Sequence, residues 1–143
     1  MSSDRARLAR LYGECEVRRD FVGEIDRRYV ERLLAHQEAY RAVGAELGIP
    51  WWFVGIIHAL ESSFDFDCHL HNGDPLTGRT VRVPAGRPDA GEPPFTWHES
   101  AVDALCGQGL SGRGDWSLGA ALDRFERYNG LGYRRRGRPS PYL

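Results

Sequence analysis

The sequence contains no lysine, since all nineteen of its basic residues are arginines. A Schiff-base lysine, a phosphate-loop lysine and a catalytic serine–lysine pair are therefore excluded. The nineteen basic residues stand against twenty acidic ones, which gives a formal charge of −1. This balance excludes a strongly basic nucleic-acid binder, and we expect no nucleic-acid partner.

Cysteines are few and scattered. Cys15, Cys68 and Cys106 lie far apart, and no two cysteines form a CxxC pair. The sequence therefore indicates neither a zinc ribbon nor a thioredoxin-type redox site. We expect synthesis in a reducing cytoplasm.

Long apolar runs are also missing. The longest, over 49–60, is interrupted by Pro50, Gly55 and His58, and none approaches the ~20 residues that span a bilayer. The N-terminal segment is charged and lacks the apolar stretch of a secretory signal. We expect no membrane insertion and no signal peptide.

What remains is the composition of a globular protein: 41% of the 143 residues are apolar, 11% aromatic and 27% charged. This length predicts a single domain over 1–143. A chain of this size buries ~68–70% of its unfolded surface, enough for a cleft-bearing enzyme. We expect a monomer. The chain ends on a proline-broken segment, 139–143, without a capping element, which leaves open whether it is a piece of a longer protein.

Apolar residues recur at helical spacing in several segments. A long helix is expected over 20–47, where an apolar stripe includes Phe21, Ile25 and Tyr29. Further helices are expected over 4–12, over the nearly all-apolar 50–62, over 101–105 and from Asp115 or Ser117 to Tyr128. Thr96 and Glu99 fit a capping box before the segment 101–105.

The middle of the chain, 65–94, has a different character. It holds five prolines, a turn signal at 72–75 and a short β-like piece at 79–83. These features predict a small β-hairpin or three-stranded ribbon followed by an irregular loop over 84–94. The expected fold class is α+β, mostly helical, with the hairpin beside a helical body.

Glu61 ends the apolar helix and shares a face with Val54 and Ile57. A carboxyl group held against these side chains loses hydration, which raises its pKa toward the range of a general acid. The alternative is a solvated carboxylate in a last helical turn. Glycoside hydrolysis requires a second carboxylate, for which Asp65, Asp67 and Asp74 are candidates. Asp74 is equally explained as a turn former before Pro75.

Two short motifs indicate a family. Glu61-Ser62 at the end of an apolar helix resembles the catalytic Glu-Ser of goose-type lysozymes and soluble lytic transglycosylases. The segment Tyr128-Asn129-Gly130-Leu131-Gly132-Tyr133 is similar to the Tyr-Asn-x-Gly signature of the same superfamily, and the order of the two motifs agrees. On these residues the chain resembles the lysozyme superfamily. This resemblance implies a lysozyme-like fold.

A second resemblance is to phage-type lysozymes, in which an Asp follows the catalytic Glu and a Thr follows that Asp six residues later. Asp74 and Thr80 have this spacing. By this resemblance Glu61 is the general acid, Asp74 holds or activates a water, and Thr80 helps to position it. The sequence departs from the pattern in the longer Glu61 to Asp74 spacing and in the run that follows Thr80.

The resemblance implies an endolysin-like muramidase that cleaves the β-1,4 bonds of peptidoglycan, without a cofactor. A lytic transglycosylase and a hydrolase of chitin oligomers are the enzymatic alternatives, and a non-catalytic glycan-binding module is the alternative from another class. The protein would act at the cell wall after export or release. Expected substrate-binding residues are His71, Trp97, Tyr128, Asn129 and Tyr133, as aromatic platforms or hydrogen-bonding groups for sugars.

A metal site is the remaining alternative. The His69-x-His71 spacing would place both rings on one face of a strand, and Asp67, Cys68, His58 and Asp74 are close to them in sequence. These residue types are zinc ligands. No downstream pair completes a known zinc pattern, so the glycosidase interpretation is favoured.

Overall fold

The computed structural model describes residues 2–112 and 114–138, and the described chain separates into two compact units. One unit comprises residues 1–22 and 114–143, and the other comprises 23–113. The prediction of a single domain concerns the whole chain and stays a prediction.

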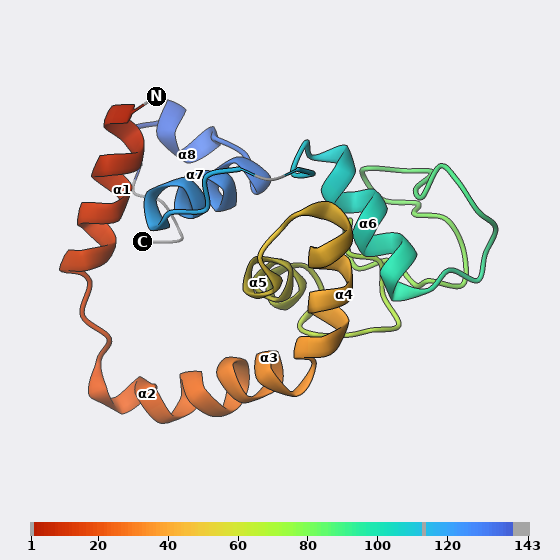
Figure 1. Cartoon of the computed structure of the whole chain (residues 1–143), viewed down its shortest axis with the longest axis horizontal. Coiled ribbons are helices and arrows are strands. Elements are labelled where there is room, and N and C mark those ends of the chain that lie inside the picture. The colour runs from red at the N-terminus through yellow and green to blue at the C-terminus, as the bar shows by residue number, and fades with distance from the viewer. Residues whose placement is uncertain (1, 113, 139–143) are drawn as a thin grey trace. The chain divides into compact units, whose positions relative to one another are not determined.

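The first unit pairs the two ends of the chain. Helix α1 (Ser2–Glu14) packs against α7 (Leu118–Tyr128), and the short α8 (Gly132–Arg135) follows (Figure 1). Gly119 permits the close approach, because a Cβ atom there would lie 2.5 Å from the carbonyl oxygen of Arg5. The expected helix 4–12 lies within α1, and the expected helix to Tyr128 begins at Leu118, after Ser117 as its N-cap. Residues 139–143 of the expected tail lie outside the described residues.

The second unit is built around α4 (Gln37–Leu47), which packs against α5 (Trp51–Ser62) and α6 (Trp97–Gly107) (Figure 1). Its interior is formed by apolar side chains from all three helices and the following loop, among them Tyr40, Val43, Phe53, Val54, Ile57, Leu70 and Leu105. The capping box predicted for α6 is confirmed: the Thr96 hydroxyl accepts from the Glu99 N–H, and the Glu99 carboxylate accepts from the Thr96 N–H.

The expected continuous helix over 20–47 is interrupted. It consists of α2 (Arg19–Ile25), a π-helical turn η1 (Asp26–Val30), α3 (Glu31–Ala35) and α4, with the break at His36. No residue of α2, η1 or α3 is buried. Phe21 and Tyr29 of the apolar stripe are 40% and 47% exposed. Only α4 carries its apolar face into the interior, so the chain changes direction where that packing begins.

The predicted β-hairpin is wrong. Among the described residues there is no β-strand, and the segment between α5 and α6 is a loop that contains only one isolated bridge, between Cys68 and Pro75 (Figure 1). The backbone N–H groups of Val81 and Arg82, which a strand ladder would need, donate instead to the Asp74 carboxylate. The described fold is helical, and the expected α+β class is corrected accordingly.

The described helices include none that is by itself long and apolar enough to cross a bilayer. Helices α4 and α5 reach that length and apolarity only when they are taken together, and the pair is bent by 115°.

The sharp bend between α4 and α5 depends on Gly44. A Cβ atom at this position would lie 2.5 Å from the carbonyl oxygen of Ile49, a backbone atom of the turn. We expect Gly44→Ala to lower the free energy of unfolding by about 1–3 kcal/mol, the usual cost of overpacking. This cost exceeds the gain in helix propensity, which is at most about 1 kcal/mol.

Urea unfolding followed by circular dichroism measures the effect of Gly44→Ala. Gly78→Ala is the matched control in the same unit, because nothing lies within 4 Å of a Cβ atom there. An unchanged midpoint for Gly44→Ala would show that the turn relaxes at no cost.

Candidate functional site

The carboxyl group of Glu61 lies at the end of α5, where the helix leaves the interior. It is partly buried, and this loss of hydration raises its pKa. No charged neighbour or hydrogen bond among the described residues contributes to the shift. Glu61 is therefore a desolvated carboxyl group that is not used in an ion pair, as the helical spacing predicts.

The backbone immediately after Glu61 is strained. Ser63 and Phe64 both have positive φ, at 54° and 63°, although neither is a glycine. Such conformations cost of order 1–3 kcal/mol each and cluster at functional sites. The Phe64 ring is 5% exposed and packs edge-on against His58, which helps to hold the turn in this conformation.

A tight turn covers the end of α5. Gly73 has a φ of 75°, and a Cβ atom there would lie 3.2 Å from the carbonyl oxygen of Glu61. The turn is closed by the Gly73 N–H, which donates to the His69 carbonyl, and by the Asp74 N–H, which donates to the Asn72 side chain. The structure therefore brings the turn at 69–74 next to the backbone of Glu61.

Asp74 organises the next loop. One of its carboxylate oxygens accepts from the N–H groups of Val81 and Arg82, at 2.9 and 3.0 Å, and the other accepts from Nε of Arg82 at 2.5 Å. The N–H of Arg82 first, and the Arg82 guanidinium with it, lower the pKa of Asp74 to about 2. Its side chain is 5% exposed. Both oxygens are thus engaged with the protein, which leaves Asp74 little capacity to activate a water.

Thr80 closes the same loop. Its hydroxyl donates to the Pro84 carbonyl and accepts from the Arg87 N–H, and its backbone N–H donates to the Arg87 carbonyl. The residue is 3% exposed. The structure therefore places Asp74 and Thr80 in one loop, each bound to its backbone. Their assignment as the pair that positions water stays a prediction.

His71 belongs to a buried polar network. Its Nε2 lies 2.7 Å from the Asp103 carboxylate, to which Arg87 also donates two hydrogen bonds, and its Nδ1 lies 3.4 Å from the Ser100 hydroxyl. Burial lowers the pKa of His71, against the opposing effect of Asp103. Only 3% of the His71 side chain is exposed, so its ring offers little surface to a sugar.

The order Ser100, His71, Asp103 has the residue types of a catalytic triad, but the geometry does not support acyl transfer. Ser100 is fully buried and accepts a hydrogen bond from the Leu70 N–H. Because His69 Nε2 faces the Gly78 carbonyl and must donate there, its Nδ1 accepts the Ser100 proton.

The network holds 69–71, 78 and 87 against α6. Sequence reasoning missed Ser100, Asp103 and Arg87, since nothing local marks them as partners of the loop.

His58 is also fully buried, inside a group of aromatic rings. Its Nε2 lies 3.0 Å from the Asp65 carbonyl, which can only accept, so this nitrogen carries the proton. Its Nδ1 therefore accepts from the Tyr40 hydroxyl at 3.0 Å. The neutral ring is fully satisfied, and burial lowers the pKa of His58 to about 4.

The metal alternative lacks a donor set in the described residues, where no three His, Cys, Asp or Glu side chains gather into a metal-binding group. His58, His69 and His71 are each committed to hydrogen bonds within the protein.

Trp97 is 7% exposed and packs against Tyr40, His58 and Phe66. Its indole N–H has no hydrogen-bond partner among the described residues. Tyr128, Asn129 and Tyr133 belong to the other unit, at the end of α7 and in α8. Tyr133 is 47% exposed, whereas the Asn129 amide faces the Phe125 carbonyl as part of the helix end. Their role in substrate binding stays a prediction.

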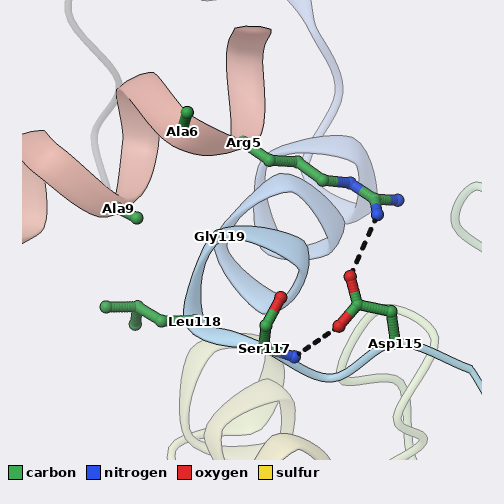
Figure 2. Close-up of a pocket in the computed structure, with 7 residues that line it drawn as sticks. All are labelled: Arg5, Ala6, Ala9, Asp115, Ser117, Leu118 and Gly119. Carbon is green, nitrogen blue, oxygen red and sulfur yellow. Dashed lines mark hydrogen bonds and ion pairs between the residues drawn. The ribbon is translucent and has the colours of Figure 1, made fainter. Parts of the chain in front are cut away.

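A pocket of about 570 Å³ lies in the first unit. Ala6, Ala9 and Leu118 give it a mainly apolar lining, and an ion pair between Arg5 and Asp115 borders it (Figure 2). None of the predicted site residues lines this pocket.

Comparison with protein-family models, curated proteins and solved structures finds no match. The resemblance to the lysozyme superfamily therefore depends on the motifs that contain Glu61, Asp74, Thr80 and Asn129.

Proposed function

We propose that the protein is a glycosidase that cleaves β-1,4 bonds of peptidoglycan, with Glu61 as its general acid. The observation that carries the proposal is the Glu61 carboxyl: it is desolvated, its pKa is raised and none of the described residues holds it ionised as a cationic partner. A carboxylic acid in this state can protonate the leaving oxygen while the sugar becomes oxocarbenium-like. The strained backbone at Ser63 and Phe64 supports a functional role for the same corner.

The engaged carboxylate of Asp74 bears on the second half of the reaction. If water attacks, a base must accept its proton, and Asp74 already receives three hydrogen bonds from the protein. Attack by the 6-hydroxyl of the muramic acid residue requires no second protein carboxylate, because ionised Glu61 can accept that proton. This geometry favours 1,6-anhydro products over reducing ends.

The test is digestion of purified peptidoglycan with the full chain, followed by mass spectrometry of the released fragments. We expect soluble muropeptides from wild type and none from Glu61→Gln. Anhydro ends would indicate intramolecular attack, and reducing ends would indicate hydrolysis with a water that another group activates. Glu38→Gln, at a side chain 90% exposed on α4, is the matched control and should digest like wild type. Binding to peptidoglycan without any release would overturn the enzyme proposal in favour of a glycan-binding module.

A further inference from the structure

The loop 80–87 presents three side chains to solvent from a tightly held backbone. Val81 and Val83 are 82% and 89% exposed, the two highest values among the large apolar side chains of the described residues. The Arg82 side chain between them is 65% exposed. The backbone that carries them is closed by the hydrogen bonds from the Thr80 and Gly86 N–H groups, at 2.8 and 2.7 Å.

Arg82 is fixed at its base and open at its tip. Its N–H and its Nε both bind the Asp74 carboxylate, and its carbonyl accepts from the Asn72 amide at 2.9 Å. The two terminal nitrogens of the guanidinium donate no hydrogen bond to any described residue. A guanidinium held in this way presents paired donors to a carboxylate with little remaining entropy to lose.

The position of Arg82 relates it to Glu61. Asn72, which binds the Arg82 carbonyl, precedes Gly73, and Gly73 lies against the Glu61 carbonyl. The backbone at the end of α5 is therefore connected to the Arg82 backbone through one turn and one hydrogen bond. For its substituents to reach Arg82, a glycan bound at Glu61 must extend past the turn at 72–74.

We propose that Arg82 is a specificity-determining residue that binds the carboxylates carried by the glycan, with Asp74 as the residue that positions it; this inference rests on the proposed function. The lactyl-peptide substituents of peptidoglycan carry carboxylates next to methyl groups, which match a guanidinium between two exposed valines. Chitin oligomers are neutral and offer no such group. The loop would thus select the acidic, peptide-bearing glycan over the neutral one.

The experiment measures binding and cleavage separately. Wild type, Arg82→Gln and Arg82→Lys are mixed with native peptidoglycan and with peptidoglycan whose carboxylates have been amidated with carbodiimide and ethanolamine. We expect wild type to bind the native polymer about tenfold more tightly than the amidated one, in the range of one hydrogen-bonded charge. Arg82→Gln should bind both alike, and Arg82→Lys should retain part of the preference. Arg41→Gln, at an exposed α4 arginine, is the control for charge and should behave like wild type.

The outcomes separate this inference from the proposed function. Cleavage by wild type with the same preference in Arg82→Gln would overturn the role of Arg82 and leave the glycosidase proposal standing. A carboxylate preference that disappears in Arg82→Gln, without cleavage by any form, would support the role of Arg82 in binding and overturn the enzyme proposal. Equal binding of native and amidated polymer by wild type would overturn the role of Arg82 whatever the cleavage result.

Discussion

Replacement of Glu61 by glutamine is expected to reduce peptidoglycan cleavage by a factor of about 10²–10⁴, the usual contribution of a general acid. Glutamine preserves the size of the side chain and its position at the end of α5. It cannot release a proton to the leaving oxygen. Release of muropeptides over time, measured at several enzyme concentrations, gives the factor, and cleavage within threefold of wild type would contradict the assignment.

The same substitution is expected to raise the free energy of unfolding at neutral pH. Burial raises the pKa of Glu61 above its unfolded value. The stability that this shift contributes is fully present below the unfolded pKa and is lost as pH rises through the folded pKa. As pH rises through the folded pKa, wild type therefore loses stability that glutamine, which does not ionise, keeps; such a relation between activity and stability is typical of functional sites.

Urea unfolding of wild type and Glu61→Gln at pH 5 and pH 7 measures this effect. The advantage of the variant should be larger at pH 7, and Glu38→Gln should show no such difference. The activity of wild type should also decline on the alkaline side above the usual carboxyl range, because the acid must be protonated. A pH-independent stability difference would show that the Glu61 carboxyl is not desolvated.

Acidification from pH 6.5 to pH 4 is expected to remove about 3 kcal/mol of stability through His58. Burial lowers the pKa of His58 to about 4, so the unfolded chain binds a proton over this range before the folded chain does. The contribution is fully present above the unfolded pKa of 6.5 and is lost as pH falls through the folded value. Burial of His71 lowers its pKa as well and adds to the loss in the same direction.

The measurement is urea unfolding at steps between pH 4 and pH 7, with NMR titration of the His58 ring. The ring should stay neutral until about pH 4. His58→Gln should lose stability at pH 7, since glutamine lacks the ring that packs among Tyr40, Phe66 and Trp97, and should show a shallower pH dependence. His98→Gln is the control, because that ring is 43% exposed. A His58 ring that titrates near 6.5 would contradict the expectation even if the variant fails to fold.

The sequence was a good guide where the signals are local. Pro50 marks the start of α5 and the apolar spacing marks its extent, and the capping residues Thr96 and Glu99 mark the start of α6. The expected 101–105 covers only the middle of α6, which spans Trp97–Gly107. The desolvation of Glu61 was predictable for the same reason, since its face of the helix is set by residues three or four positions away. The apolar stripe over 20–34 predicted a buried face of one long helix. Its period indicates a helix but not whether another element packs against it, and here most of the stripe is exposed.

The loop 65–94 was decided by contacts that no local pattern shows. The β-like piece 79–83 has strand residues, but Asp74 takes the N–H groups of Val81 and Arg82 that a neighbouring strand would have needed. Arg87 is drawn to Asp103 on α6, sixteen residues later, which fixes the far end of the loop. These interactions join residues distant in sequence, so the alternation of side chains could not predict them.

By itself the sequence determined most of the helical segments, the capping box of α6 and a desolvated carboxyl group at the end of an apolar helix. Only the tertiary structure decided that His71 is hydrogen-bonded within a buried network and that Asp74 holds the loop 80–87. It also decided that this loop exposes the Arg82 side chain to solvent. The physical reason is the same in each case. The hydrogen bonds of a polar side chain are chosen among partners that only folding brings within reach, whereas helix formation and desolvation along one helix are settled by near neighbours.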